Sequence, residues 1–146
     1  MWNLDEKVIR NISDLPLEDH TLPFGFVYII ENLDNKRLYI GKKQLVFSRK
    51  VKKGKKELIL MKDKRRSKFK TILKESDWLD YTGSSKELGA DIDKGHKIIK
   101  TIIDICYSRS DLSYSEARYL FRCDVLNDKR YYNKNILGKF YRKEGK

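Results

Sequence analysis

The sequence lacks the features that define several large classes of protein. Its two cysteines, Cys106 and Cys123, are too few for a disulfide scaffold and do not have the paired spacing of a zinc site. No apolar run approaches the roughly 18 residues of a membrane span. The N-terminus carries Asp5, Glu6 and Lys7 in place of the apolar segment of a signal peptide. We therefore expect a cytoplasmic protein with two buried thiols and no contact with a membrane.

Histidine is also scarce, and the chain has no internal repeat and no linker-like stretch. His20 and His96 are both flanked by charged or loop-forming residues, so each is predicted to be an ordinary surface side chain. Aromatic residues make up 12% of the chain, which argues against a disordered tail. The 146 residues are therefore predicted to form a single domain, 1–146.

Positive charge is abundant and is concentrated in one segment. The net charge is +12, and the stretch from Lys42 to Lys74 holds 15 Lys and Arg residues against 2 acidic ones. The rest of the chain has 18 basic and 19 acidic residues, so this segment carries the whole excess. Such a balance indicates a polyanionic partner, nucleic acid before an anionic membrane. The alternative is that the basic segment, residues 42–76, is simply a solvated charged surface.

Three strands and a turn are predicted for the core. Gly25–Ile30 is rich in β-branched and aromatic residues, Asn32–Asn35 has turn chemistry, and Arg37–Gly41 returns as a second strand, which gives an antiparallel hairpin. Lys97–Tyr107 is predicted to be the third strand. The fold class is therefore α+β: a small, central, mostly antiparallel three-stranded sheet flanked by helices.

The basic segment is predicted to contain an inserted β-hairpin. Val46–Val51 alternates apolar and polar residues, Lys52–Lys56 suggests a turn centred on Gly54, and Glu57–Leu60 returns as an apolar run. Residues 62–76 then have apolar side chains spaced for one face of a helix.

Two further helices are predicted, each from a capping pattern. Ser84–Lys94 begins with Ser-Ser-Lys-Glu and ends near Gly95, and Ser113–Leu126 begins with serine and has glutamate three residues later. Residues 1–24 are predicted to be a helical or irregular lead-in. The tail after Tyr131 is predicted to be irregular.

The most specific pattern is a pair of tripeptides on the predicted hairpin, Val27-Tyr28-Ile29 and Tyr39-Ile40-Gly41. They resemble the signature of the GIY-YIG nucleases, with Val27 where isoleucine is usual and Phe26 where the leading glycine would stand. Glu116 after the third strand and Tyr132-Asn133 beyond it fit the order and spacing of that family. The segments Tyr39–Lys43 and Trp78–Ser85 most resemble the phage Seg-type, homing-like endonucleases.

The resemblance implies metal-dependent cleavage of DNA to 5′-phosphate and 3′-hydroxyl ends. It implies that Tyr28 is the general base, that Glu116 binds one Mg²⁺ or Mn²⁺ ion and that Asn133 braces Glu116. Tyr39 would orient water or phosphate. A phenol has a pKa near ~10 and needs nearby cations to act at neutral pH, which Lys42 and Lys43 could supply. One of these lysines should face the site, and Lys42 is favoured.

Two of these residues have plain structural alternatives. Glu116 lies three residues after Ser113 and could only complete a capping box. Asn133 could make ordinary turn hydrogen bonds, and Asn135 is close enough to be confused with it.

The sequence departs from the family pattern after Gly41. The family has an arginine on a helix soon after that point, with a histidine or tyrosine one turn later, and here the basic segment interrupts it. Arg49, Arg65, Arg66 and Lys68 compete for the arginine's role, and Tyr81 is a candidate for the second aromatic residue.

The basic segment is the predicted nucleic-acid-binding surface, with double-stranded DNA as the expected partner. It has few side chains suited to base recognition, so it should contribute affinity more than specificity. Its candidate contacts are Arg49, Lys50, Lys52, Lys53, Lys55, Lys56, Lys64, Arg65, Arg66 and Lys68.

The resemblance implies that many homing relatives carry a separate DNA-recognition domain, and we expect none in these 146 residues, which leave no room for one. The chain should therefore be weakly specific, use the inserted hairpin or form a homodimer. The alternative function is a catalytically inactive module that binds nucleic acid through the same surface, and nothing in the sequence separates RNA from DNA.

Overall fold

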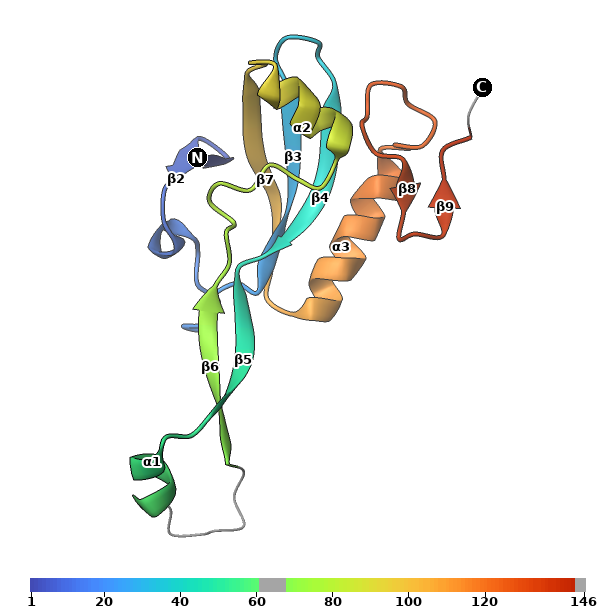
Figure 1. Ribbon diagram of the computed structural model, residues 1–146. Coiled ribbons are helices and arrows are strands. Elements are labelled where there is room, and N and C mark those ends of the chain that lie inside the picture. Colours follow the sequence, from blue (N-terminus) through green and yellow to red (C-terminus); the bar gives the residue numbers. More distant parts are fainter. Residues whose placement is uncertain (61–67, 144–146) are drawn as a thin grey trace.

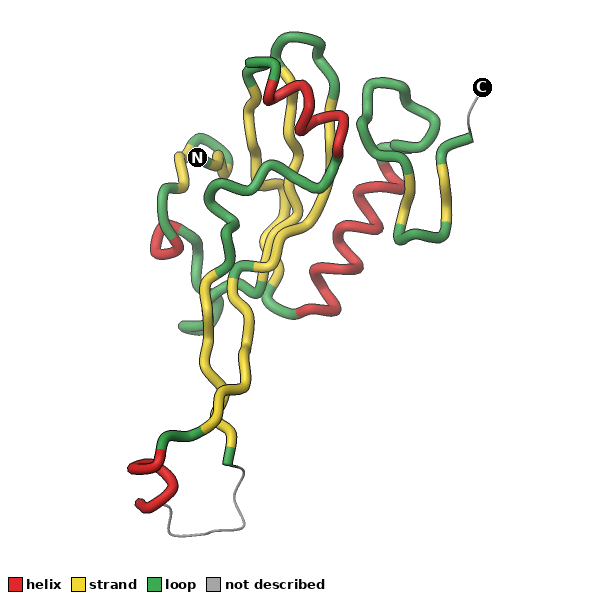
Figure 2. The backbone as a smooth tube through the Cα atoms, in the orientation of Figure 1, coloured by secondary structure: helices red, strands yellow, loops and turns green. Residues whose placement is uncertain are grey.

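The computed structural model describes residues 1–60 and 68–143. These residues form an α+β fold with one mixed sheet, two separate two-stranded ribbons and three α-helices (Figures 1 and 2). The main sheet has the strand order β2-β1-β7-β3-β4. In chain order the elements are β1 (Trp2–Leu4), β2 (Lys7–Ile9), a short 3-10 helix (Ile12–Asp14), β3 (Gly25–Asn32), β4 (Leu38–Gln44), β5 (Val46–Lys52), α1 (Lys55–Leu60), β6 (Phe69–Glu75), α2 (Lys86–Asp93), β7 (Ile98–Cys106), α3 (Arg109–Arg122), β8 (Asn135–Ile136) and β9 (Phe140–Tyr141).

The predicted hairpin and third strand are confirmed as β3, β4 and β7. Strand β3 pairs antiparallel with β4 on one side and with β7 on the other. In this register Tyr28 lies opposite Gly41, and Ile30 lies opposite Tyr39. Because β3 is central and covered on both faces, Val27 and Tyr28 are both buried although they point in opposite directions.

Residues 1–24 were predicted to be helical or irregular, but they begin with strands β1 and β2. These two strands join the main sheet, which therefore has five strands and not the three predicted. Strand β1 pairs parallel with β7 and antiparallel with β2. Trp2 and Ile9 are fully buried, and the indole nitrogen of Trp2 donates a hydrogen bond to the carbonyl oxygen of Trp78 at 2.7 Å. Strands of three residues are too short to show a period in the sequence, so burial against the sheet decides their conformation.

The inserted segment forms a two-stranded ribbon, but its strands are not those predicted. Residues 57–60, predicted as the returning strand, belong to helix α1. The returning strand is β6, within the stretch predicted as a helix, and it pairs antiparallel with β5. The apolar residues of β6 fit a helical spacing and a strand equally well, and pairing with β5 decides between them. Part of the predicted helix lies outside the described residues.

Both remaining helices begin at other residues than predicted. Helix α3 is capped by Ser108, whose side chain accepts from the backbone N–H of Asp111 at 3.1 Å, so Ser113 lies inside the helix. Helix α2 is capped by Ser85, and Gly95, with φ of +95°, follows its end as predicted. The end predicted for α3 is also too late, since the helix stops at Arg122.

Two apolar clusters cover the two faces of the main sheet. Helix α3 packs on one face, where Leu112 and Leu120 join Val27 and Ile40. The other face holds an aromatic cluster, which includes Trp2, Phe26, Tyr28 and Trp78. The site described below lies where β4, at the edge of the sheet, meets α3 and the start of α2.

Some smaller predictions also need correction. The tail is not wholly irregular, because β8 and β9 pair antiparallel within it. Cys106 is a buried free thiol as predicted, whereas Cys123 is only half-buried. His20 is exposed, but His96 is half-buried and its Nδ1 contacts the amide of Asn32 at 2.9 Å. Within the described residues, no helix is long and apolar enough to cross a membrane.

Candidate active site

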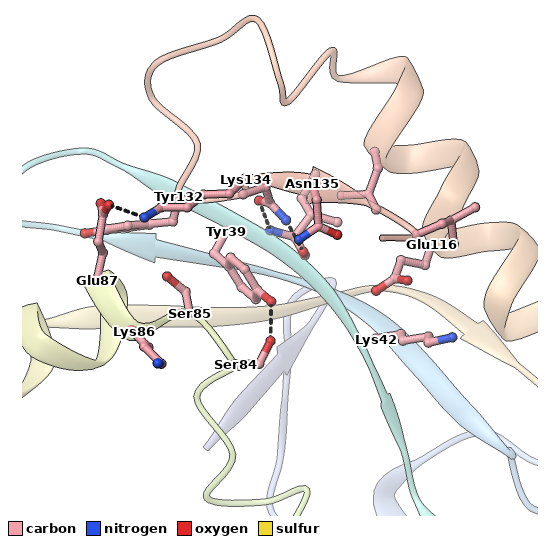
Figure 3. Close-up of a pocket in the computed structure, with 14 residues that line it drawn as sticks. Tyr39, Lys42, Ser84, Ser85, Lys86, Glu87, Glu116, Tyr132, Lys134 and Asn135 are labelled. Carbon is pink, nitrogen blue, oxygen red and sulfur yellow. Dashed lines mark hydrogen bonds and ion pairs between the residues drawn. The ribbon is translucent and has the colours of Figure 1, made fainter. Parts of the chain in front are cut away.

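An open pocket of about 610 Å³ runs along strand β4 between helix α3 and the start of α2 (Figure 3). Four of the six side chains predicted to carry the chemistry line it: Tyr39, Lys42, Glu116 and Asn133. Tyr28 and Lys43 do not. The other residues that line it are Ile40, Ser84, Ser85, Lys86, Glu87, Leu120, Tyr132, Lys134, Asn135 and Leu137.

Glu116 lies on the face of α3 that packs on the sheet. Leu112 and Leu120, one turn before and one turn after it, are both buried, so an apolar side chain would be ordinary at this position. Burial raises the pKa of the Glu116 carboxyl group, and the charge and backbone N–H of Lys42 oppose that shift. Because the helix is capped by Ser108, the capping-box interpretation of Glu116 is excluded.

Lys42 and Lys43 are neighbours on β4 and point to opposite sides of the strand. The Nζ of Lys42 donates to the Ser113 hydroxyl at 3.1 Å, one turn from Glu116. The Nζ of Lys43 lies 2.6 Å from a carboxylate oxygen of Asp77 and 3.9 Å from the centre of the Tyr81 ring. Lys42 is therefore the lysine that faces the pocket, whereas Lys43 points to the face of the sheet that holds the aromatic cluster.

Tyr39 is held at the pocket by the segment that leads into α2. Its hydroxyl shares a hydrogen bond of 2.8 Å with the Ser84 hydroxyl. Gly83, with φ of +87°, lies against its ring, and a Cβ there would be 2.8 Å from Cε1 of Tyr39. The Gly-Ser-Ser part of the Trp78–Ser85 motif thus leaves room for the tyrosine, holds its hydroxyl and caps the next helix.

Tyr28 is buried behind Tyr39 and is only 1% exposed. Its ring packs against Trp2, Phe26, Tyr39 and Tyr81, with ring centres 5.1 to 6.2 Å away. Burial raises the pKa of its phenol well above the ordinary value, and the neighbouring phenols and Glu116 add to the shift. In the free protein, Tyr28 is therefore a neutral phenol.

Asn133 supports the strand at the edge of the sheet. Its side-chain oxygen accepts from the backbone N–H of Ile40 at 3.0 Å, and its side-chain nitrogen donates to the Ile40 carbonyl at 2.8 Å. The resemblance implied that Asn133 braces Glu116, but its amide instead fixes the backbone between Tyr39 and Gly41. Asn135 also lines the pocket, and its side chain accepts from the backbone N–H of Gly138.

Sequence reasoning missed two lysines of the pocket, Lys86 and Lys134. Lys86 is the first residue of α2 and is exposed at the pocket wall. Lys134 follows Asn133, and its Nζ lies 3.0 Å from the Glu87 carboxylate, which also pairs with Arg37 at 2.9 Å. The position of Lys134 beside the Tyr132-Asn133 motif was an available signal, whereas nothing in the sequence placed Lys86 beside Tyr39.

The predicted DNA-binding residues that the structure describes lie away from the pocket. Those that it describes lie on the β5–β6 ribbon, on α1 or in the adjoining turns. None of these described residues lines the pocket. Lys64, Arg65 and Arg66 lie outside the described residues, and the two described candidates for the family arginine's role, Arg49 and Lys68, do not line the pocket. The residues so placed are Arg49, Lys50, Lys52, Lys53, Lys55, Lys56 and Lys68.

The oxygen donors of the pocket suit a hard divalent cation that keeps most of its water. Among residues 1–60 and 68–143, no group of three or more His, Cys, Asp and Glu side chains could hold a metal by itself. Glu87 is occupied by two cations, which leaves Glu116 as the carboxylate that could take a new one. Mg²⁺ commonly uses one or two carboxylates together with water and substrate phosphate oxygens, so Glu116 fits such a site.

Residues 13–136, most of the chain, match the family model described as "Putative endonuclease segE, GIY-YIG domain". No curated protein and no solved structure matches the chain. The matched range spans the hairpin with both tyrosines, α3 with Glu116, and Asn133.

Proposed function

The chain belongs to the GIY-YIG superfamily as a Seg-type endonuclease domain, and from this premise we propose that it cleaves double-stranded DNA by metal-dependent hydrolysis of phosphodiester bonds. The observation that carries the proposal is Glu116. It is a half-buried carboxylate on the sheet-facing side of α3, beside Lys42 and open to the pocket. A structural role gives no reason for a costly charge at this position.

We assign the metal to Glu116. One Mg²⁺ or Mn²⁺ ion bound there, when present, would neutralise charge on the scissile phosphate and help to stabilise the leaving 3′ oxygen. The Lys42 ammonium group, on the same side of β4, would add a fixed positive charge at the phosphate. Asn133 would act through the backbone of Ile40, by keeping Tyr39 and Lys42 at their places on the strand.

Tyr28 is the proposed general base, and its burial sets a condition on that role. Its hydroxyl lies beside the gap left by Gly41 and Gly83, directly behind the ring of Tyr39. With its pKa raised in the free protein, the phenol must be brought closer to ionisation when substrate and metal are bound. Tyr39, whose hydroxyl is at the pocket, would orient the water or the phosphate.

Lys86 is our proposal for the position that an arginine holds in the family. The helix that follows the hairpin along the chain, once the ribbon is set aside, is α2, and Lys86 is its first residue. Its side chain lines the same pocket as Glu116 and Tyr39. Lys134 is less suited to a phosphate because Glu87 already partly neutralises it.

The test is incubation of the protein with supercoiled plasmid, with Mg²⁺, with Mn²⁺ and with a chelator. We expect nicked and linear products only when a metal is present. Glu116→Gln should abolish cleavage and retain DNA binding, whereas the matched variant Glu87→Gln should still cleave. Cleavage in chelator, or by Glu116→Gln at the parent rate, would contradict the metal assignment.

The second candidate is a nucleic-acid-binding module without catalysis. The observation in its favour is the burial of Tyr28, whose raised pKa is opposite to what a base requires. This function predicts binding of plasmid with no product under any metal condition. A competition with duplex RNA in the same assay decides which polymer the protein prefers.

A further inference from the structure

The β5–β6 ribbon extends away from the body of the protein, below the main sheet in Figures 1 and 2. Of its side chains, only Val46 and Val51 are half-buried, and the others are exposed. The ribbon and the residues between its strands that the structure describes, 46–60 and 68–76, hold nine Lys and Arg residues and two Glu residues. The ribbon therefore has two accessible faces, and the register of its strands determines which side chains share each face.

The two faces differ in how their charges are arranged. On one face, each cross-strand pair joins one cation and one apolar residue: Phe47 with Lys74, Arg49 with Ile72, and Val51 with Lys70. We call this set of six residues the alternating face. Its cations alternate between the strands along the ribbon, with Lys74 on β6, Arg49 on β5 and Lys70 on β6, so each cross-strand pair has one positive charge. The opposite face has its lysines at one end and an acid at the other; it consists of Val46, Ser48, Lys50, Lys52, Phe69, Thr71, Leu73 and Glu75.

Large apolar side chains on the alternating face are accessible to a partner. Phe47 is 44% exposed and Ile72 is 39% exposed, and a two-stranded ribbon has no core in which they could be buried. A two-stranded ribbon fits the major groove of B-DNA, where apolar side chains contact thymine methyl groups. Strands of seven residues extend over ~23 Å, at ~3.3 Å per residue. This length corresponds to ~7 base pairs at ~3.4 Å each.

We propose that the alternating face of the ribbon is a docking surface for duplex DNA. Arg49 and Lys74 contact phosphates, and Phe47 and Ile72 lie against the groove. Lys70 contributes less because it is paired with Glu57 of α1 at the far end of the ribbon. The choice of DNA as the partner rests on the proposed function, whereas the choice of face rests on the register alone.

The experiment compares variants that each lose two positive charges. The first carries Arg49→Gln and Lys74→Gln on the alternating face, the second Lys50→Gln and Lys52→Gln on the opposite face. A third carries Lys94→Gln and Lys97→Gln, exposed positions on the body between α2 and β7. Binding to a labelled duplex is measured by fluorescence anisotropy at several salt concentrations, without metal so that DNA stays intact.

The first variant should bind about tenfold or more weakly at 0.1 M salt, and its slope of log affinity against log salt should be shallower by about two. The second and third should lose clearly less. Equal losses in the first and second would overturn the choice of face, and equal losses in all three would show an effect of net charge alone. The parent protein should be a monomer by sedimentation velocity. If it is a dimer, and the double variant Phe47→Ser, Ile72→Ser is a monomer, the alternating face is a self-association surface and the proposal is wrong.

These outcomes do not depend on catalysis. If the protein binds DNA through the alternating face but yields no product with metal, the proposed cleavage fails and the docking surface stands. If it cleaves plasmid while the first variant binds as tightly as the parent, the docking surface fails and the proposed function stands.

Discussion

Gly41 lies directly opposite Tyr28 across the β3–β4 pair, and a Cβ at Gly41 would be 2.5 Å from the Tyr28 hydroxyl oxygen. Gly41, the last residue of the second tripeptide, therefore leaves the space that is filled by Tyr28 of the first tripeptide. Gly83 makes a similar space for Tyr39, 2.8 Å from its ring. The absence of a Cβ at Gly41 and at Gly83 thus makes room for the side chains of Tyr28 and Tyr39.

The first prediction concerns this space. Gly41→Ala should lower the free energy of unfolding by about 1–3 kcal/mol, because the added methyl group forces the Tyr28 ring or the strand to move. Chemical denaturation measures the change. The matched control is Gly89→Ala inside α2, where a Cβ meets nothing within 4 Å and should raise stability by about 0.5–1 kcal/mol. A Gly41→Ala protein as stable as the parent would show that the site has more room than the structure gives it.

The second prediction uses the opposite pKa shifts of Glu116 and Glu87. The raised pKa of Glu116 means that its contribution to stability is present at low pH and is lost as the pH rises through the folded pKa. Glu116→Gln should therefore melt at a higher temperature than the parent at pH 7, with the difference closing toward pH 4. Loss of stability in this variant at pH 7 would show that the carboxylate is structurally needed.

Glu87 supplies the control of opposite sign. Lys134 and Arg37 lower its pKa, so its contribution is present above the unfolded pKa and is lost as the pH falls. Glu87→Gln should melt at a slightly lower temperature at pH 7, and this difference should also close toward pH 4. The effect should be small because the pair is accessible to solvent. Thermal melts of both variants from pH 4 to pH 8 test the two signs together.

The parts of the fold that could be predicted are those in which local pattern and packing agree. Strands β3 and β7 are long and mainly apolar, and the turn residues 32–35 lead from β3 into β4, so the sequence alone indicates all three strands. Strand β6 could not be recognised, because its apolar residues suit a helix or a strand and only the pairing with β5 decides. The start of α3 was misplaced because Ser108 and Ser113 both offer a capping side chain, and the chain uses the earlier one.

The candidate site divides in the same way. The spacing of the family motifs led to Tyr39, Lys42 and Glu116, which lie together in the pocket. Sequence could not show that the partner of Asn133 is the backbone of Ile40, because a backbone partner leaves no trace in residue identity. It also could not place Lys86, which reaches the pocket only because the chain returns from the ribbon to the edge of the sheet.

The third prediction concerns Lys100, a buried lysine whose Nζ donates to the carbonyl oxygens of Leu79 and Tyr81 at 2.8 and 3.0 Å. Burial lowers its pKa to about 8. The unfolded chain therefore binds more protons than the folded one between about pH 8 and pH 10, and stability should rise with pH across that range. Urea midpoints of the parent and of Lys100→Met should differ in slope against pH over this interval. Parallel slopes would show that Lys100 titrates normally.

The last prediction separates the roles of the two tyrosines. Tyr28→Phe and Tyr39→Phe each remove one hydroxyl and leave the ring, so both should fold and bind DNA. If Tyr28 takes the proton, Tyr28→Phe should lower single-turnover cleavage by on the order of 10²-fold or more. Tyr39→Phe removes the hydrogen bond to Ser84 and an orienting group, so its loss should be smaller. Single-turnover rates at saturating DNA, measured from pH 6 to pH 9, make the comparison.

The pH profiles decide between a base and a packing residue. A phenol that acts as base with its pKa still above the working range gives a rate that rises with pH in the parent, and the residual rate of Tyr28→Phe should lose that rise. Ser84→Ala is the control, because it breaks the same hydrogen bond as Tyr39→Phe and keeps both phenols. A parent-like rate and pH profile in Tyr28→Phe would make Tyr28 part of the aromatic core alone. A deeper loss in Tyr39→Phe than in Ser84→Ala, together with loss of the pH rise, would transfer the base to the tyrosine that lines the pocket.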